Sequence, residues 1–254
     1  MVWFSAFIVG ICVGLLGSGG SILNIPILIY LAKESEKVAI AESLVNVGLI
    51  AVFAAIPYAR NHLIVWRSVL LFGIPGMAGS YIGASLSPYV SSVFQLTLLA
   101  IIMFLAAYFM FRPRQTHPQL PNQKHWKIMS EGFLIGILTG LLGVGGGFLI
   151  VPSLILLGGL EIHKAVGTSL VIIAMKSSTG YLKYHDVLAS LGLSFNWKLI
   201  WVFTGLGIAG SFVGSFISGK ISQSTIQRVF AVSLILVGTY MLVNSIPMLP
   251  AFGR

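Results

Sequence analysis

The stretch that decides the fold occurs twice in the chain. Residues 10–26 read GICVGLLGSGGSILNIP, and residues 136–152 read GILTGLLGVGGGFLIVP. With an offset of 126 residues, 10 of the 17 aligned positions are identical. The same offset carries Ser43 onto Ser169, and a slightly larger offset continues the match later in each half. A repeat of this length predicts two homologous halves with the same architecture.

The composition places both halves in a membrane. The chain has 254 residues, of which 57% are hydrophobic and 8% are charged, and its mean hydropathy is +0.97. A soluble domain carries about 25% charged residues. The 15 Lys and Arg exceed the 6 Asp and Glu, but they are spread over short loops, so we expect no nucleic-acid partner. The sequence predicts an all-α, polytopic membrane protein surrounded by a lipid bilayer.

Each half contains four apolar segments. The second to fourth are long enough to cross the membrane, because about 20 residues span the hydrocarbon core. The first is interrupted by a glycine cluster, GSGGS at 17–21 or GVGGG at 143–147, and such clusters are poor helix formers. The segments are 2–32, 38–58, 66–87 and 92–111 in the first half, and 129–159, 163–184, 197–218 and 224–246 in the second.

The halves are joined by a polar linker with three prolines. We therefore divide the chain into a first membrane repeat at 1–111, a linker at 112–127 and a second membrane repeat at 128–254.

Two topologies fit this pattern. The broken segment of each half either crosses, which gives four spans per half and a parallel repeat, or folds back as a re-entrant hairpin, which gives an inverted repeat. Counting Lys and Arg does not separate them, because either topology puts nine on one side and five on the other, with Lys176 inside a span. Both place the linker on the side presumed cytoplasmic by its positive charge. Matching broken helices in inverted halves are a transporter pattern, which slightly favours the inverted repeat.

The two glycine breaks are the first candidates for a binding site. A non-helical break inside a bilayer is tolerated only where protein or a polar cavity surrounds it. Its free N–H groups, and the positive end of the following helix dipole, would hold an anion. The alternative is close packing, which we expect for the small-xxx-small pairs Gly10/Gly14, Gly136/Gly140, Gly79/Gly83 and Gly210/Gly214. The predicted anion ligands in the breaks are Gly17, Ser18, Gly19, Gly20, Ser21, Gly143, Gly145, Gly146 and Gly147.

Polar side chains in the second span of each half extend this candidate site. Ser43 and the pair Thr168-Ser169 lie near the starts of their spans and could donate hydrogen bonds to an anion, or bond to their own helix backbone. Asn46 is a further polar lining residue. Lys176 lies well inside its span, where a cation usually faces a cavity or a partner. It would compensate an anionic substrate, unless it snorkels to an interface or pairs with a carboxylate.

Glu42 is the acid that lies well within an apolar run of the first half. A carboxyl group shielded from water there is a candidate to carry a coupling proton, although it could equally lie at the water interface. Na⁺ is the other coupling ion that we consider.

Other chemistries lack a sequence signal. The five histidines have no metal-ligand spacing, and Cys12 is the sole cysteine, which excludes an intrachain disulfide and a cysteine-based metal site. The glycine-rich GLLGSGG is not followed by Lys-Ser/Thr, so it is not an ATP phosphate loop. No nucleophile motif is present. We therefore expect no cofactor, no metal and no enzymatic activity.

These motifs resemble a known family. GLLGSGGSILNIP and GLLGVGGGFLIVPSLILLGG, together with AVGTSLVII, resemble the two repeated signatures of the sulfite exporter TauE/SafE family, also called the 4-toluene sulfonate uptake permease family. The resemblance implies a bacterial or archaeal inner-membrane carrier of sulfur-containing anions such as sulfite, sulfoacetate or thiosulfate. Two departures stand out: Glu42 occupies the place that Thr168 has in the other half, and Lys176 stands where a neutral polar residue is expected.

The function predicted from residues and resemblance together is a secondary transporter of small sulfur oxyanions, working by alternating access. The anion would lie between the two glycine breaks. An anion channel using the same loops is the first alternative, and an integral membrane enzyme or assembly factor is the second. The Gly-x-x-x-Gly faces could also support a homodimer.

Overall fold

The fold is described from a computed structural model that covers residues 1–16, 20–111, 125–156, 158–218 and 223–245. Within these ranges all regular secondary structure is helical, with no strand. The first half contains α1 (Val2–Leu16), α2 (Ser21–Pro26), the π-helical segment η1 (Ile27–Leu31), α3 (Glu36–Arg60), α4 (Trp66–Leu86), the 3₁₀ turn η2 (Ser87–Tyr89) and α5 (Ser92–Phe111). The second half contains α6 (His125–Leu142), α7 (Gly147–Leu156), α8 (Ile162–Ser190), α9 (Trp197–Ser218) and α10 (Gln223–Ser245).

Several helices match the predicted membrane spans. In the part of the chain that the structure describes, four helical segments are long and apolar enough to cross a bilayer: Glu36–Arg60, Trp66–Tyr89, Ser92–Phe109 and Trp197–Ile217. This confirms the prediction of an all-α fold with several segments suited to cross a membrane. Helix α8 fills the place of another predicted span and carries three lysines in its 29 residues.

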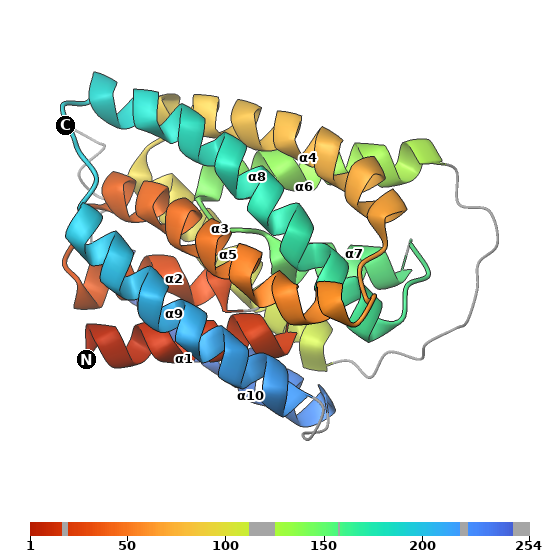
Figure 1. The fold of residues 1–254 in the computed structure, drawn as a ribbon. Helices are drawn as coiled ribbons and strands as arrows, with labels where there is room; N and C mark the ends of the chain where they lie inside the picture. The colour runs from red at the N-terminus through yellow and green to blue at the C-terminus, as the bar shows by residue number, and fades with distance from the viewer. Residues whose placement is uncertain (17–19, 112–124, 157, 219–222, 246–254) are drawn as a thin grey trace.

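The helices form one bundle, in which α3 and α8 pass through the centre and α9 lies beside α1 (Figure 1). Two pairs approach at glycine faces, as the small-xxx-small spacing predicts. A Cβ built on Gly10 of α1 would overlap the backbone of Gly207 on α9, and one on Gly136 of α6 would overlap the backbone of Gly76 on α4. The prediction that these glycines serve close helix packing is confirmed. The first helix of each broken segment, α1 or α6, therefore packs against the helix of the third apolar segment in the other half, α9 or α4.

Helix directions in the first half follow from the residues in contact. Gly10 and Gly14 of α1 meet Gly207 and Ser211 of α9 in the same order, so α1 and α9 run parallel. Helix α3 is also parallel to α9, since its Asn46 bonds to Thr204 and its Ile50 contacts Gly207. Helices α1 and α3 therefore point the same way. The chain between them must return to the side where α1 began.

Residue contacts also give the helix directions in the second half. Gly76 and Ser80 of α4 meet Gly136 and Gly140 of α6 in the same order, and they also meet Lys176 and Gly180 of α8 in the same order. Helices α4, α6 and α8 thus run parallel to one another. Helices α3 and α8 run antiparallel, because Leu44 and Tyr58 of α3 contact Gly180 and Gly167 of α8 respectively. In Figure 1, where the colour follows the residue number, α3 and α8 run across the molecule in opposite directions.

Candidate functional site

The break in the second half is a buried, irregular turn between α6 and α7. Gly143 and Gly146 have φ values of +67° and +75°, which favour glycine. A Cβ on Gly143 would overlap the backbone of Ile40 in α3, and one on Gly146 would overlap Thr139. Gly147 begins α7, whose first N–H groups have no acceptor within the helix. The sequence places glycine where the turn and its neighbours leave no room for a side chain.

The break in the first half is described only in part. Gly17, Ser18 and Gly19 lie outside the described residues. Gly20 packs against α1, where a Cβ would overlap the backbone of Val9, and Ser21 begins α2 and is buried.

The two breaks approach each other beside the α3–α8 crossing. A Cβ on Gly145 would lie 2.5 Å from Val47 Cγ1 of α3 and 2.8 Å from Ile173 Cγ2 of α8. It would also lie 3.7 Å from the Cβ atom of Ser21, in the other half. The structure therefore brings residues from both predicted breaks and both central helices into one place.

Five buried polar residues lie on α2, α3 and α8, the elements that meet near this crossing, and we call them the crossing cluster: Asn24, Ser43, Asn46, Lys176 and Ser177. All five are buried, and each has one polar side-chain atom without a hydrogen-bond partner in the described ranges: Asn24 Oδ1, Ser43 Oγ, Asn46 Nδ2, Lys176 Nζ and Ser177 Oγ.

One hydrogen bond joins two members of the crossing cluster, and other contacts join members to neighbouring helices. Asn24 Nδ2 donates to the carbonyl oxygen of Ser43 at 3.4 Å, and Asn46 Oδ1 accepts from Thr204 Oγ1 at 3.0 Å. Ser177 lies against Gly48 of α3. Leaving buried polar groups unpaired costs several kcal/mol in hydrocarbon. The unpaired groups on α2, α3 and α8 are therefore candidates for contact with a polar ligand.

Lys176 is the charged member of the crossing cluster. Its side chain is 2% exposed and lies across Gly76, with Cδ 3.0 Å from where a Cβ would stand. In the described residues no carboxylate lies within ion-pair distance of its ammonium group. The predicted alternatives, snorkelling or pairing with a carboxylate, therefore find no support. Ile50 contacts Gly207 in the matching place of the first half, without a charge.

Glu42 and Thr168, which occupy equivalent repeat positions, each bind a helix start in the other half. Glu42 Oε1 accepts from the backbone N–H of Asn196 at 2.7 Å, directly before α9. Thr168 Oγ1 accepts from the backbone N–H of Val65 at 3.0 Å, directly before α4. Glu42 is fully buried, and its Oε2 has no partner among the described residues. Thr168 contacts the α3–α4 connection and lies apart from the crossing cluster.

The remaining predicted ligand, Ser169, donates to the carbonyl oxygen of Val166 at 2.7 Å. That bond is the local helix contact that we considered as the alternative for this residue.

Sequence reasoning missed several residues of this region. Asn24, Ser177 and Thr204 were passed over because each is a lone polar residue in an apolar helix. Tyr58 and Tyr184 could have been found from the sequence, because they are related by the repeat offset of 126 residues. Their hydroxyl groups donate to the carbonyl oxygens of Gly14 and Leu141, each at 3.0 Å, near the ends of α1 and α6. They satisfy carbonyl groups that the breaks leave exposed.

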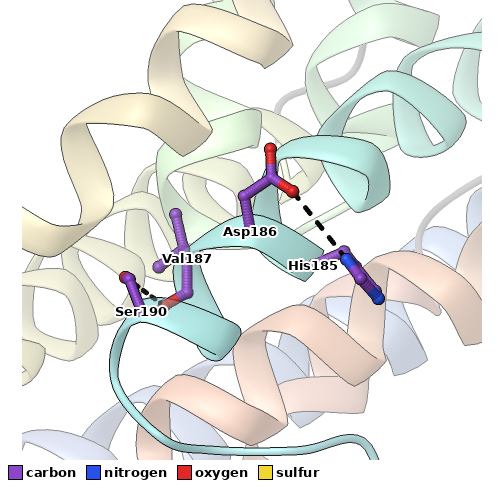
Figure 2. A network of polar contacts seen from close by, with 4 residues as sticks. All are labelled: His185, Asp186, Val187 and Ser190. Atoms are coloured by element: carbon purple, nitrogen blue, oxygen red, sulfur yellow. Dashed lines mark hydrogen bonds and ion pairs between the residues drawn. The ribbon is translucent and has the colours of Figure 1, made fainter.

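His185 is a histidine at the surface of the protein. His185 is exposed near the end of α8, where its ring faces the carboxylate of Asp186 at 3.8 Å (Figure 2). The same view shows Ser190 bonded to Val187, a local helix contact. Among the described residues no group of three His, Cys, Asp or Glu could hold a metal ion.

Comparison with known proteins identifies the family to which this chain belongs. Residues 2–241 match the sulfite exporter TauE/SafE family, and the chain belongs to that family. A probable membrane transporter protein of Xylella fastidiosa strain Temecula1 is 32% identical over 251 residues, covering 95% of this chain and 94% of the relative. The probable membrane transporter YunE of Bacillus subtilis is 26% identical over 267 residues, covering 94% and 95%. No solved structure matches the chain.

These matches confirm the predicted family. They identify the chain as a membrane transporter and not an enzyme.

Proposed function

We propose that this protein is a secondary transporter of small sulfur-containing anions, either sulfonates such as sulfoacetate or the inorganic anions sulfite and thiosulfate. It works by alternating access in the cytoplasmic membrane of a bacterium or archaeon. The sulfur chemistry rests on the family to which the chain belongs. The anionic charge rests on the residues of the crossing cluster.

The observation that carries the proposal is the chemistry of the unpaired atoms. Ser43 Oγ, Asn46 Nδ2, Ser177 Oγ and Lys176 Nζ can all donate hydrogen bonds, and Lys176 can add a positive charge. Sulfonate and sulfite present several acceptor oxygens and a negative charge. An anion at the crossing would pair these donors at the depth where water is scarce, which is the usual role of an ionisable group inside a membrane.

The helix directions support an inverted repeat with re-entrant hairpins. Helices α1 and α3 point the same way, so the segment containing α2 returns without adding a net crossing. The equivalent helices α6 and α8 point the opposite way. Each half would then contribute three spans and one hairpin, with the hairpin tips meeting near the middle of the bilayer. The linker would lie on the cytoplasmic side.

The glycine interfaces support a particular division into moving parts. Backbones in direct contact leave little freedom to slide, so α1 with α9 and α4 with α6 would each move as a unit. The α3–α8 crossing lies between these units and contains the unpaired polar groups. Movement there would open the crossing cluster alternately to the two sides.

Thermal stabilisation of the purified protein tests the proposal. Sulfite, thiosulfate, sulfate, sulfoacetate, taurine and matched carboxylates would each be added, because a ligand of the folded state raises stability by RT ln(1 + [L]/Kd). We expect a sulfur anion to stabilise the wild type and Lys176→Ala to weaken its binding at least about tenfold, with exposed Lys198→Ala as the control. Stabilisation by carboxylates or cations alone would overturn the sulfur assignment. Saturable counterflow in liposomes would separate a carrier from a channel.

A further inference from the structure

Two hydrogen bonds in the structure are equivalents of each other under the sequence repeat. Asn196 donates its backbone N–H to Glu42, and Val65 donates its backbone N–H to Thr168. The acceptors are 126 residues apart and the donors are 131 residues apart, which are the two offsets of the repeat. Each donor directly precedes a tryptophan that begins a helix of the other half. We call these bonds the Glu42 contact and the Thr168 contact.

The two contacts lie near opposite ends of the antiparallel α3–α8 pair. Gly167, next to Thr168, contacts Tyr58 of α3. Tyr58 is 16 residues beyond Glu42, which is roughly 24 Å along a helix. That separation approaches the thickness of the hydrocarbon core, about 30 Å. Each contact joins α3 or α8 to a helix of the opposite half, so each would be made or altered as one side of the transporter opens.

The contacts differ in one chemical respect. A threonine hydroxyl supplies one oxygen and never carries a charge, whereas a carboxyl group supplies two oxygens and can bind a proton. Glu42 Oε1 and Thr168 Oγ1 have the same role, because each accepts a hydrogen bond from the backbone N–H that directly precedes a helix. Glu42 Oε2 is additional, fully buried, and without a partner in the described part of the chain.

The surroundings of Glu42 allow both protonation states. The facing carboxylate is Glu34, which accepts from the side chain of the same Asn196 at 2.8 Å and disfavours a second negative charge. The start of α9 favours a negative charge through its dipole.

The charged residues on the neighbouring elements are engaged elsewhere or exposed. On α3, Lys37 bonds to Ser87, Val90 and Gln95, and Glu36 lies in the first turn. Lys198 on α9 and Lys33 before α3 are exposed, as are His185 and Asp186 near the end of α8. None of them forms an ion pair with Glu42.

Glu42 also lies next to the proposed anion site. Ser43 follows it directly, and Asn46 is one helical turn away, where side chains are about 5–6 Å apart. A bound anion would repel an ionised carboxylate at that distance. By linkage, anion binding must then favour the protonated carboxyl group, and protonation must favour the anion.

We propose that Glu42 is a proton-binding site that couples anion transport to a proton moving in the same direction. The proton and the anion bind together. The proton binds to Glu42, whose contact with Asn196 lies at one end of the α3–α8 pair. The Thr168 contact on the other side does not titrate. This inference rests on the proposed function.

The experiment measures protons moved per anion in liposomes that contain the purified protein and a pH-sensitive dye. A sulfonate is the anion used, because it does not titrate near neutral pH as sulfite does. Wild-type protein should move protons with the anion, and E42Q, which keeps an acceptor oxygen for Asn196, should lower the proton-to-anion ratio at least about tenfold. E161Q is the control, since Glu161 is an exposed acid that pairs with Lys164 at the start of α8, and it should keep the wild-type ratio.

A binding measurement covers the case in which E42Q carries no flux. In the wild type, the apparent affinity for the sulfonate should fall by up to about tenfold per pH unit once the carboxyl group loses its proton. In E42Q the affinity should be constant over this range. Anion flux without proton movement in the wild type, or an unchanged pH dependence in E42Q, would overturn the inference and leave the proposed function standing. Absence of any saturable anion flux or anion binding would overturn both.

Discussion

The side chain of Lys176 lies across Gly76, with its Cδ and Cγ atoms 3.0 Å and 3.3 Å from the place where a Cβ would stand. The carbonyl oxygen of Gly132 lies 3.3 Å from the same place. Glycine at position 76 thus provides the space that the lysine chain occupies between α4, α6 and α8. The aliphatic part of the lysine side chain fits here because α4 has no side chain at position 76.

The first prediction concerns that space. Gly76→Ala should move the end of Lys176 by a few tenths of an ångström, and Gly76→Val should displace it further and disturb α6. We expect anion binding to weaken severalfold in the alanine variant, which thermal stabilisation by the sulfonate would measure. Gly205→Ala is the matched control, because a Cβ at Gly205 meets nothing within 4 Å. Unchanged anion binding in Gly76→Val would contradict the role assigned to Lys176.

The second prediction separates stability from function at Lys176. Replacing the unpaired, buried ammonium group by an apolar chain of similar length removes a desolvation cost of about 2.5–3.5 kcal/mol. Lys176→Met should therefore raise the stability of the anion-free protein while abolishing its stabilisation by sulfur anions. Melting curves with and without ligand give both quantities. A loss of stability without ligand would indicate that Lys176 has a structural partner.

The third prediction concerns the hydrogen bond between Thr204 and Asn46. Thr204→Val keeps the shape but leaves Asn46 Oδ1 buried without a donor, which should cost about 1–3 kcal/mol. It should also release the Asn46 side chain and weaken anion binding. Thr97→Val is a suitable control, because the Thr97 hydroxyl group bonds only within its own helix, to Val93. Equal melting temperatures for the two variants would argue against the bond between α3 and α9.

The fourth prediction uses the repeat as its own control. Tyr58→Phe and Tyr184→Phe each remove the hydroxyl group that donates to a carbonyl group beside a glycine break. Each should destabilise the protein by about 1 kcal/mol, and the double variant by about the sum, since the two sites are far apart. Denaturation of the single and double variants would measure this. A much larger loss for one tyrosine would show that the two breaks are held differently.

Much of the architecture could be predicted from the repeat and the hydropathy pattern. The paired breaks and the family could be predicted from the repeated motifs. The glycine-packed interfaces could be predicted because backbone contact requires small residues at fixed spacing. The direction of the broken segments was not, since the Lys and Arg counts were equal in both topologies. Direction depends on which helix meets which, as in the contact of Gly10 with Gly207, and no local pattern encodes that pairing.

The candidate site was predictable in its charged members and less so in its neutral ones. Lys176 stood out because a cation deep in a span has few explanations. Asn24, Ser177 and Thr204 did not, because a single hydroxyl or amide group in an apolar helix is common. The repeat grouped Thr168 with Ser169 near the binding site, but the antiparallel course of α8 brings Thr168 to the α3–α4 connection. Adjacent residues on one helix thus have separate surroundings.

The exchange of partners between the halves has a consequence for biogenesis. The glycine faces of α1 and α4 meet α9 and α6, which the ribosome makes later. A nascent chain that has inserted only its first half therefore holds two uncovered helix faces, and neither half is a self-sufficient folding unit. Two fragments divided at the linker would have to be synthesised together to yield an active protein.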